Sequence, residues 1–199
     1  MPFPKLMSPV FAAPARRIVI LPDAHFFMRS IPLVKGEGDE GPAAQIELAI
    51  ESLSPFPVAQ LYHGYYTRPG SGRALVFAAY RKRFPADESA TWSTADLVVP
   101  AFALLLGAPA PDGATTWLIA GVDSLTALHF EDDSGVPSAV SVQTLPPEAG
   151  EADLAAARER LLRGFPGSRT VVDLPVPVLD DEATGEKELV FQTGDIKAS

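Results

Sequence analysis

Between residues 46 and 53, apolar side chains recur at intervals of three and four, and the opposite side carries Glu47 and Glu51. This spacing predicts a helix with one buried face. The four residues that follow, 54–57, read Ser-Pro-Phe-Pro. Proline disfavours helical geometry in the residue before it and cannot continue a helix, so the helix ends here and the chain leaves in an extended form.

Two runs rich in β-branched and aromatic residues come next, at 61–67 and 74–80. The five residues between them, Arg-Pro-Gly-Ser-Gly, contain two glycines that can adopt positive φ without a steric penalty. The pattern predicts a β-hairpin with its turn at 68–72.

An earlier apolar run, Ile-Val-Ile-Leu at 18–21, is typical of a strand that is buried on both faces. Residues 26–34 can pair with it across Pro-Asp-Ala-His at 22–25, which predicts a first hairpin. A charged, glycine-rich loop at 35–41 separates this hairpin from the helix. Further along, Pro100 restricts where a helix can start, and a short helix is expected near 101–106.

A second round of similar elements begins near residue 115. Three strands are predicted at 116–122, 125–131 and 138–145, and an Ala/Leu/Arg-rich helix at 151–163. Hairpins followed by a helix therefore occur twice. A true structural duplication and an unrelated α+β sheet both explain this pattern.

The last part of the chain is less regular. Residues 170–179 form another predicted strand, which Pro175 and Pro177 push toward a sheet edge or an extended crossing. Residues 180–188 are a mostly acidic loop, and residues 189–192 are expected to pair weakly.

Composition narrows the functional classes. The 199 residues are 47% hydrophobic, which suffices for a substantial core, and the net charge of −9 leaves no electrostatic footprint for nucleic acid. The absence of cysteine excludes disulfides and thiol chemistry, and three scattered histidines leave little for a metal site.

Residues 1–15 lack the features of a secretory signal, so a cytoplasmic protein is expected. The apolar run at 97–106 is shorter than the roughly 20 residues of a membrane span.

Several short segments resemble the cytoplasmic part of type II secretion system protein L and the related type IV pilus assembly protein PilM. The similarity extends over residues 16–146. Its segments are Ile18-Val19-Ile20-Leu21-Pro22, the helix that closes on Ser54-Pro55-Phe56, the strand from Tyr62 to Tyr66, Val98-Val99-Pro100, and Trp117-Leu118-Ile119-Ala120-Gly121.

Both families belong to the actin-like ATPase superfamily, so the resemblance implies a degenerate actin-like (ribonuclease H-like) fold of mixed α+β class. It implies an N-terminal extension at 1–15, a first subdomain at 16–112, and a second at 113–199 with an acidic tail. It also implies a non-catalytic scaffold or adaptor at the cytoplasmic face of the inner membrane, without a cofactor. The implied partners are proteins of a secretion or pilus machine, including an assembly ATPase. A second copy of the chain, in a homodimer, is a further implied partner.

The superfamily also contains nucleotide-dependent enzymes, which makes an actin-like ATPase the alternative. Phosphate sites in such folds use turns in which an Asp holds hydrated Mg²⁺ and glycines expose backbone N–H groups. The turn at 21–25 has an Asp but no glycine. The turn at 121–126, Gly-Val-Asp-Ser-Leu-Thr, is the better remnant, with Asp123 and Ser124 as the candidate cofactor-binding residues. Its order departs from the usual Asp-x-Gly-x-Thr, and Asp123 and Ser124 also make an ordinary turn.

Other candidate sites have structural explanations. The tyrosines around His63 suggest an aromatic binding patch, but aromatic residues on a strand more often cover a core. Two adjacent carboxylates at 132–133 could bind a cation, although solvated loop carboxylates are the default. The basic cluster at 81–83 could contact an acidic partner or lipid, although a solvated strand end is the more common role. A stand-alone small-ligand module remains a third class.

Overall fold

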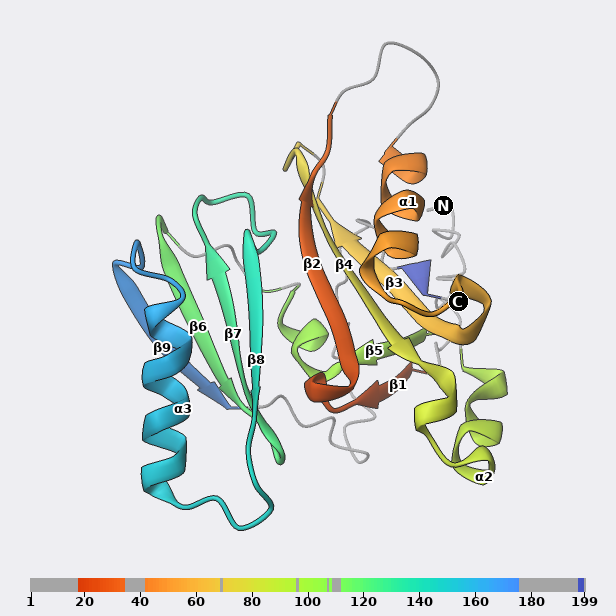
Figure 1. The fold of residues 1–199 in the computed structure, drawn as a ribbon. Helices are drawn as coiled ribbons and strands as arrows, with labels where there is room; N and C mark the ends of the chain where they lie inside the picture. Colours follow the sequence, from red (N-terminus) through yellow and green to blue (C-terminus); the bar gives the residue numbers. More distant parts are fainter. Residues whose placement is uncertain are drawn as a thin grey trace, which may run out of the picture.

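The computed structural model describes residues 18–34, 42–68, 70–95, 97–106, 108, 112–175 and 197–198. The predicted extension at 1–15, the loop at 35–41, the acidic loop at 180–188 and the weak strand at 189–192 lie outside the described residues. The described elements form two lobes that stand side by side (Figure 1).

The first lobe contains two β-sheets and several short helices. One sheet pairs β1 with β5 in parallel, and the other has the order β10-β3-β4-β2. Its elements in chain order are β1 (Ile18–Leu21), the 3-10 helix η1 (Asp23–His25), β2 (Phe26–Pro32), α1 (Pro42–Leu53), η2 (Val58–Gln60), β3 (Leu61–Thr67), β4 (Arg73–Tyr80), η3 (Arg81–Arg83), α2 (Ala86–Ala90), η4 (Thr91–Thr94), β5 (Leu97–Pro100), η5 (Ala101–Leu105) and, from the end of the chain, β10 (Lys197–Ala198).

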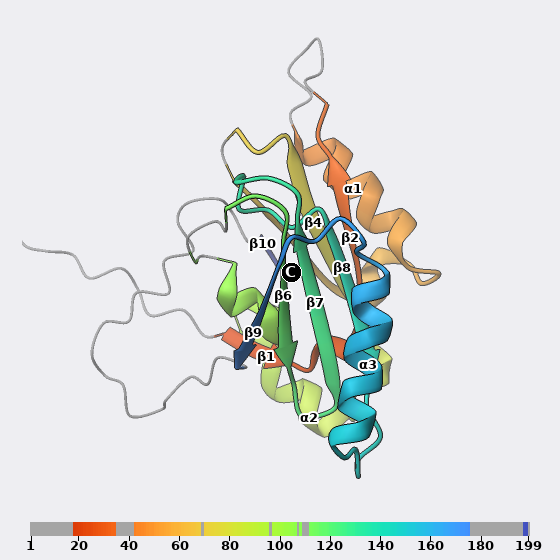
Figure 2. The ribbon, with the colours of Figure 1, turned by 90° about the vertical axis from the view of Figure 1, so that its left-hand side faces the viewer.

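The second lobe is a single four-stranded sheet with one helix on its outer face. Its elements are β6 (Thr115–Ala120), β7 (Ser124–Phe130), β8 (Ala139–Thr144), α3 (Glu151–Arg163) and β9 (Thr170–Pro175). The strand order is β8-β7-β6-β9, with β9 parallel to β6, and α3 packs against β7 and β8 (Figure 2). The predicted strands and helix of this half are confirmed, and β9 is an edge strand as its prolines indicate.

The helix and hairpin predicted from the middle of the sequence are also confirmed. Ile46 and Ile50 of α1 are buried against β4, and the backbone N–H of Phe56 is held by the Ser54 hydroxyl just after the helix ends. Phe56 then stacks on Tyr80 with ring centroids 3.8 Å apart. In the β3–β4 turn both glycines, Gly70 and Gly72, have positive φ. The expected short helix near 101–106 is the 3-10 helix η5.

The predicted pairing of the first two strands is wrong. β1 pairs in parallel with β5, from Ile18 with Leu97 to Leu21 with Pro100, whereas β2 pairs antiparallel with β4. Between β1 and β2 the chain turns through η1, which carries Asp23 into the interior. A continuous apolar run such as 18–21 is typical of a parallel strand, but the run does not indicate which later segment is its neighbour.

One apolar cluster crosses the boundary between the lobes. It contains Phe77 and Phe102 from the first lobe and Trp117 and Leu128 from the second. Tyr66 lies in the same cluster, and its hydroxyl donates a hydrogen bond to the Leu106 carbonyl. This contact confirms the core interpretation of that tyrosine. The two lobes therefore share a hydrophobic core, which is the largest apolar cluster in the described part of the chain.

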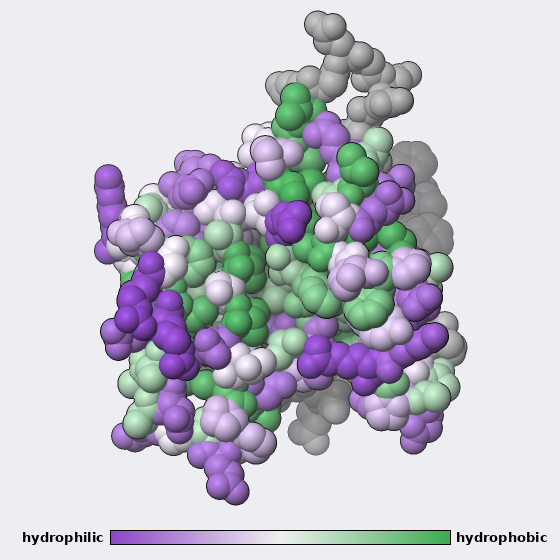
Figure 3. Space-filling model, in the orientation of Figure 1, coloured by the Kyte–Doolittle hydropathy of each residue, from purple (hydrophilic) through white to green (hydrophobic). Residues whose placement is uncertain are grey.

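The face seen in Figure 3 is not uniform in hydropathy. Hydrophilic side chains dominate over α3, whereas more apolar side chains lie between β8 and β2 (Figure 3). None of the helices in the described part of the chain combines the length and the apolar character needed to cross a membrane.

Candidate functional site

The two turns that the sequence singles out meet in the structure. η1 lies against β7 and β8, so residues 23–25 adjoin the turn at 121–126. We refer to these residues as the turn junction. Thr126 on β7 donates a hydrogen bond of 2.6 Å from its hydroxyl to Oδ2 of Asp23, across 103 positions of sequence. The junction therefore connects the first lobe to the second.

Asp23 is the centre of the junction. Its side chain is only 5% exposed. Besides the bond from Thr126 to Oδ2, the backbone N–H of Phe102 donates to Oδ1 at 3.1 Å. Both carboxylate oxygens are thus engaged by donors from segments that are distant in sequence, and Asp23 links η1, η5 and β7 in the interior.

The environment of Asp23 has a clear electrostatic effect. Burial raises the pKa of its carboxyl above the ordinary value of 3.8, while the hydrogen bonds from Thr126, Phe102 and Ala101 act in the opposite direction. The negative charge of nearby Asp123 adds to the rise. Burial disfavours the ionised form because the charge loses its solvation.

The predicted residues Asp123 and Ser124 make the tight turn between β6 and β7. Ser124 is buried and its hydroxyl donates to Oδ1 of Asp123 at 3.1 Å. The Asp123 carbonyl accepts the N–H of Leu145, and Gly121 N–H donates to the Ser124 carbonyl, both at 2.7 Å. The two residues stand beside Asp23 and its partners, but the hydrogen bonds of the turn run within the protein.

A phosphate site at the junction needs backbone N–H groups that point at a ligand. The N–H of His25 donates to Pro22, that of Gly121 to Ser124, and that of Phe102 to Asp23. A hydrated Mg²⁺ keeps several of its waters and needs a carboxylate that faces them. These three amides and the buried carboxylate of Asp23 make bonds within the protein, which suits a structural link between the lobes.

The histidines occupy separate places. His129 shares a hydrogen bond of 2.9 Å with the Thr116 hydroxyl and stacks on Phe165, and burial lowers its pKa. His25 meets the ring of Phe84 edge-on. Within the described ranges, no group of three His, Cys, Asp or Glu side chains could hold a metal ion.

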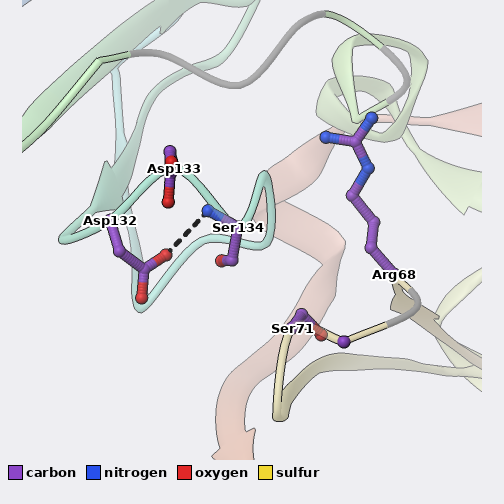
Figure 4. Close-up of a pocket in the computed structure, with 6 residues that line it drawn as sticks. Arg68, Ser71, Asp132, Asp133 and Ser134 are labelled. Atoms are coloured by element: carbon purple, nitrogen blue, oxygen red, sulfur yellow. Dashed lines mark hydrogen bonds between the residues drawn. The ribbon is translucent and has the colours of Figure 1, made fainter.

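A second feature is a polar cleft at the opposite end of the lobes. It has a volume of about 490 Å³ and is open to solvent between the β3–β4 turn and the β7–β8 turn (Figure 4). Its lining residues are Arg68, Gly70, Ser71, Asp132, Asp133 and Ser134. The N–H of Ser134 donates to Asp132 at 3.0 Å, an ordinary turn bond. The hydrogen bond from the Ser134 side chain is the main cause of a lowered pKa at Asp132.

Two structural constraints favour glycine at position 135, which lies beside this cleft. Its φ is +72°, and a Cβ built there would lie 1.9 Å from Nη1 of Arg68. We expect Gly135→Ala to lower the free energy of unfolding by about 1–2 kcal/mol from the backbone conformation alone, and further because Arg68 must move. Gly113→Ala is the matched control, since Gly113 has φ +63° but open space around it. Equal losses in urea unfolding would show that Arg68 is not held against Gly135.

No protein-family model and no curated protein sequence matches the chain. Among solved structures, a Bacteroides thetaiotaomicron protein described as having an actin-like ATPase fold and unknown function matches 85% of this chain and 62% of that chain. The TM-score is 0.50 and the sequence identity is 11%. The chain has an actin-like fold. The fold class implied by the sequence resemblance is thereby confirmed.

Two other solved structures are similar at lower scores. The PilM-PilN type IV pilus biogenesis complex matches 82% of this chain and 63% of that chain, with 21% identity and a TM-score of 0.49. The cytoplasmic domain of EpsL, an inner membrane component of the type II secretion system of Vibrio cholerae, matches 64% and 50%, with 15% identity and a TM-score of 0.39. The chain covers less than two thirds of each of the three matched chains.

Proposed function

We propose that the chain is a non-catalytic, actin-like scaffold domain of a type II secretion or type IV pilus-like assembly platform, and that it binds protein components of that machine. The proposal that the domain is non-catalytic is supported by the hydrogen bonds of Asp23. Its buried carboxylate takes hydrogen bonds from Phe102 and Thr126, so it joins the lobes where an actin-like ATPase would place a metal-binding carboxylate.

The assignment to a secretion or pilus platform is supported by the sequence segments that resemble protein L and PilM, and the actin-like fold agrees with it. The proposal includes docking of an assembly ATPase on the cytoplasmic side of the inner membrane. It also includes the division into subdomains at 16–112 and 113–199, with β10 at 197–198 pairing back onto β3 of the first lobe. The shared apolar core between the lobes suits a scaffold, because it holds the surfaces of both lobes in one arrangement.

The alternative is an actin-like nucleotide-binding ATPase that uses Asp123 and Ser124. Thermal unfolding with and without millimolar ATP and Mg²⁺ separates the two functions. A ligand present at 100 times its dissociation constant stabilises the folded state by about 2.7 kcal/mol, an increase that a melting curve detects readily. We expect no shift in the melting temperature.

A saturable shift that Asp123→Ala abolishes would overturn the non-catalytic proposal. Val122→Ala is the control in the same turn, since this side chain is fully exposed. The platform assignment is tested separately, by measuring the binding of the chain to a purified assembly ATPase of each machine. Absence of binding to both would overturn that part.

A further inference from the structure

The outward face of α1 exposes apolar side chains. α1 packs on the larger sheet of the first lobe, on the side away from the second lobe (Figure 1), and it buries Ile46 and Ile50 there. On the opposite side of the helix, Leu48 is 67% exposed. Val34 is 70% exposed, and the side-chain amide of Gln45 bonds to both its backbone N–H and its carbonyl. Residues three apart are neighbours on a helix surface, so Val34 and Leu48 both adjoin Gln45.

The same face of α1 carries two carboxylates that have no cation beside them. Glu47 and Glu51 are exposed, and neither makes an ion pair with another residue in the described ranges. They are four positions apart, a spacing at which like charges are unfavourable on a helix. Glu51 also lies in the last turn of α1, where the helix dipole favours a cation, and this turn has no basic residue. Both charges therefore lie where the helix itself disfavours them.

α3 shows the opposite arrangement of charge. Its first turn is acidic and its last turn is basic, as the helix dipole favours. Glu159 and Arg163, four positions apart, form an ion pair of 3.6 Å. The uncompensated charge of α1 is thus particular to that helix. Carboxylates that are unfavourable in the isolated chain become favourable when another molecule supplies cations to them, since charges across an interface are arranged to be complementary.

We propose that the outward face of α1 is a docking site for a basic amphipathic helix of a protein partner. Apolar side chains of that helix cover Leu48 and Val34, and cations at its positions i and i+4 pair with Glu47 and Glu51. A helix rises about 1.5 Å per residue, so helices that lie along each other present such pairs at the same spacing of about 6 Å. This inference deepens the proposed scaffold function and rests on it.

The charge of this face disfavours two other occupants. A two-fold contact between copies places the same patch against itself, so it would set the carboxylates of one α1 against those of the other. An anionic lipid surface attracts basic segments and would repel Glu47 and Glu51. The occupant must therefore supply positive charge together with apolar side chains.

The test uses the full-length chain and a fluorescein-labelled synthetic peptide of about 15 residues, long enough to form a helix when it binds. The peptide is an alanine helix with leucines along one face and arginines beside them at four-residue spacing. We expect saturable binding in fluorescence anisotropy, and the affinity should fall as salt is added because exposed charges are screened. The same peptide with glutamates in place of the arginines should not bind.

Variants of the chain locate the site. Glu47→Arg/Glu51→Arg should bind the arginine peptide at least tenfold more weakly, while its melting temperature should not fall, because a cation suits the last turn of a helix. Asp112→Arg/Glu148→Arg is the matched control, since it makes the same change in net charge at exposed positions outside α1. This control should bind like the unmodified chain. Leu48→Ala should weaken binding about fivefold through the loss of apolar contact.

Several outcomes would overturn the proposal. One is binding of the arginine peptide that does not saturate, and another is equal loss of affinity in the two charge-reversed chains. Dimerisation in sedimentation experiments that Leu48→Ala abolishes would make a second copy the occupant. A nucleotide-dependent thermal shift, or absence of binding to an assembly ATPase, would overturn the proposed function without changing the peptide affinities, so the two failures are distinguishable.

Discussion

Replacing Asp23 with alanine should lower the free energy of unfolding by about 2–6 kcal/mol, because each buried donor left without an acceptor costs about 1–3 kcal/mol. The variant leaves two such donors, the backbone N–H of Phe102 and the hydroxyl of Thr126. Urea unfolding measures the loss. Asp123→Ala, in the neighbouring turn, is the control and should cost much less, since that side chain is only half-buried.

Asp23→Asn separates the charge from the geometry. Asparagine can accept from Phe102 through its oxygen and donate to the Thr126 hydroxyl through its amide, so the fold should persist. Because burial raises the pKa of Asp23 in the folded state, the native protein holds its proton more tightly than the unfolded chain. Stability should therefore fall as pH rises from 3.8 through the raised pKa, and then stay level to neutral pH.

The asparagine variant should lack that part of the pH dependence. Its stability relative to the unmodified chain should consequently increase over the same interval. A difference that does not change with pH would show that Asp23 titrates as it does in the unfolded chain. A loss of the fold in Asp23→Asn would show that the interior requires the ionised carboxylate.

Phe102→Ala should cost about 3–5 kcal/mol, the usual range for truncating a buried phenylalanine. Phe102 has no exposed surface and belongs to the cluster that both lobes share. Phe27→Ala is the matched control because Phe27 is 38% exposed, and it should lose far less. Chemical denaturation measures both. Similar losses would mean that the shared cluster repacks around the missing ring.

The two large predictions are coupled through one residue. The Phe102 backbone donates to Asp23 while its side chain fills the core. A double variant of Asp23 and Phe102 should therefore depart from the sum of the single losses, as contacting residues generally do.

Local patterns in the sequence predicted much of this structure. The helix that ends at Ser54-Pro55, the β3–β4 hairpin with its glycines, and α3 all depend on neighbours within a few residues. Periodicity and turn chemistry report such contacts directly. The tyrosines of β3 were predicted to cover a core, and the burial of Tyr66 bears this out.

The pairing of β1 and the burial of Asp23 could not be predicted in this way. Asp23 reaches Phe102 across 79 positions and Thr126 across 103. An aspartate after a proline is also typical of an exposed turn, and nothing beside it in sequence indicates that its partners are elsewhere. At the candidate site, the sequence selected the two turns, but their contact through Thr126 depends on how the lobes pack.

The parallel pairing of β1 with β5 has a consequence for how the chain assembles. Strands β6, β7 and β8 pair with their immediate neighbours, which closes only short loops. β1 must wait for β5, far along the sequence, and long-range pairing is intrinsically slow. Until then the segment Ile-Val-Ile-Leu is an apolar strand without a partner, the kind of intermediate that aggregates. During synthesis β1 is made before β5 and joins its sheet only after β5 has formed.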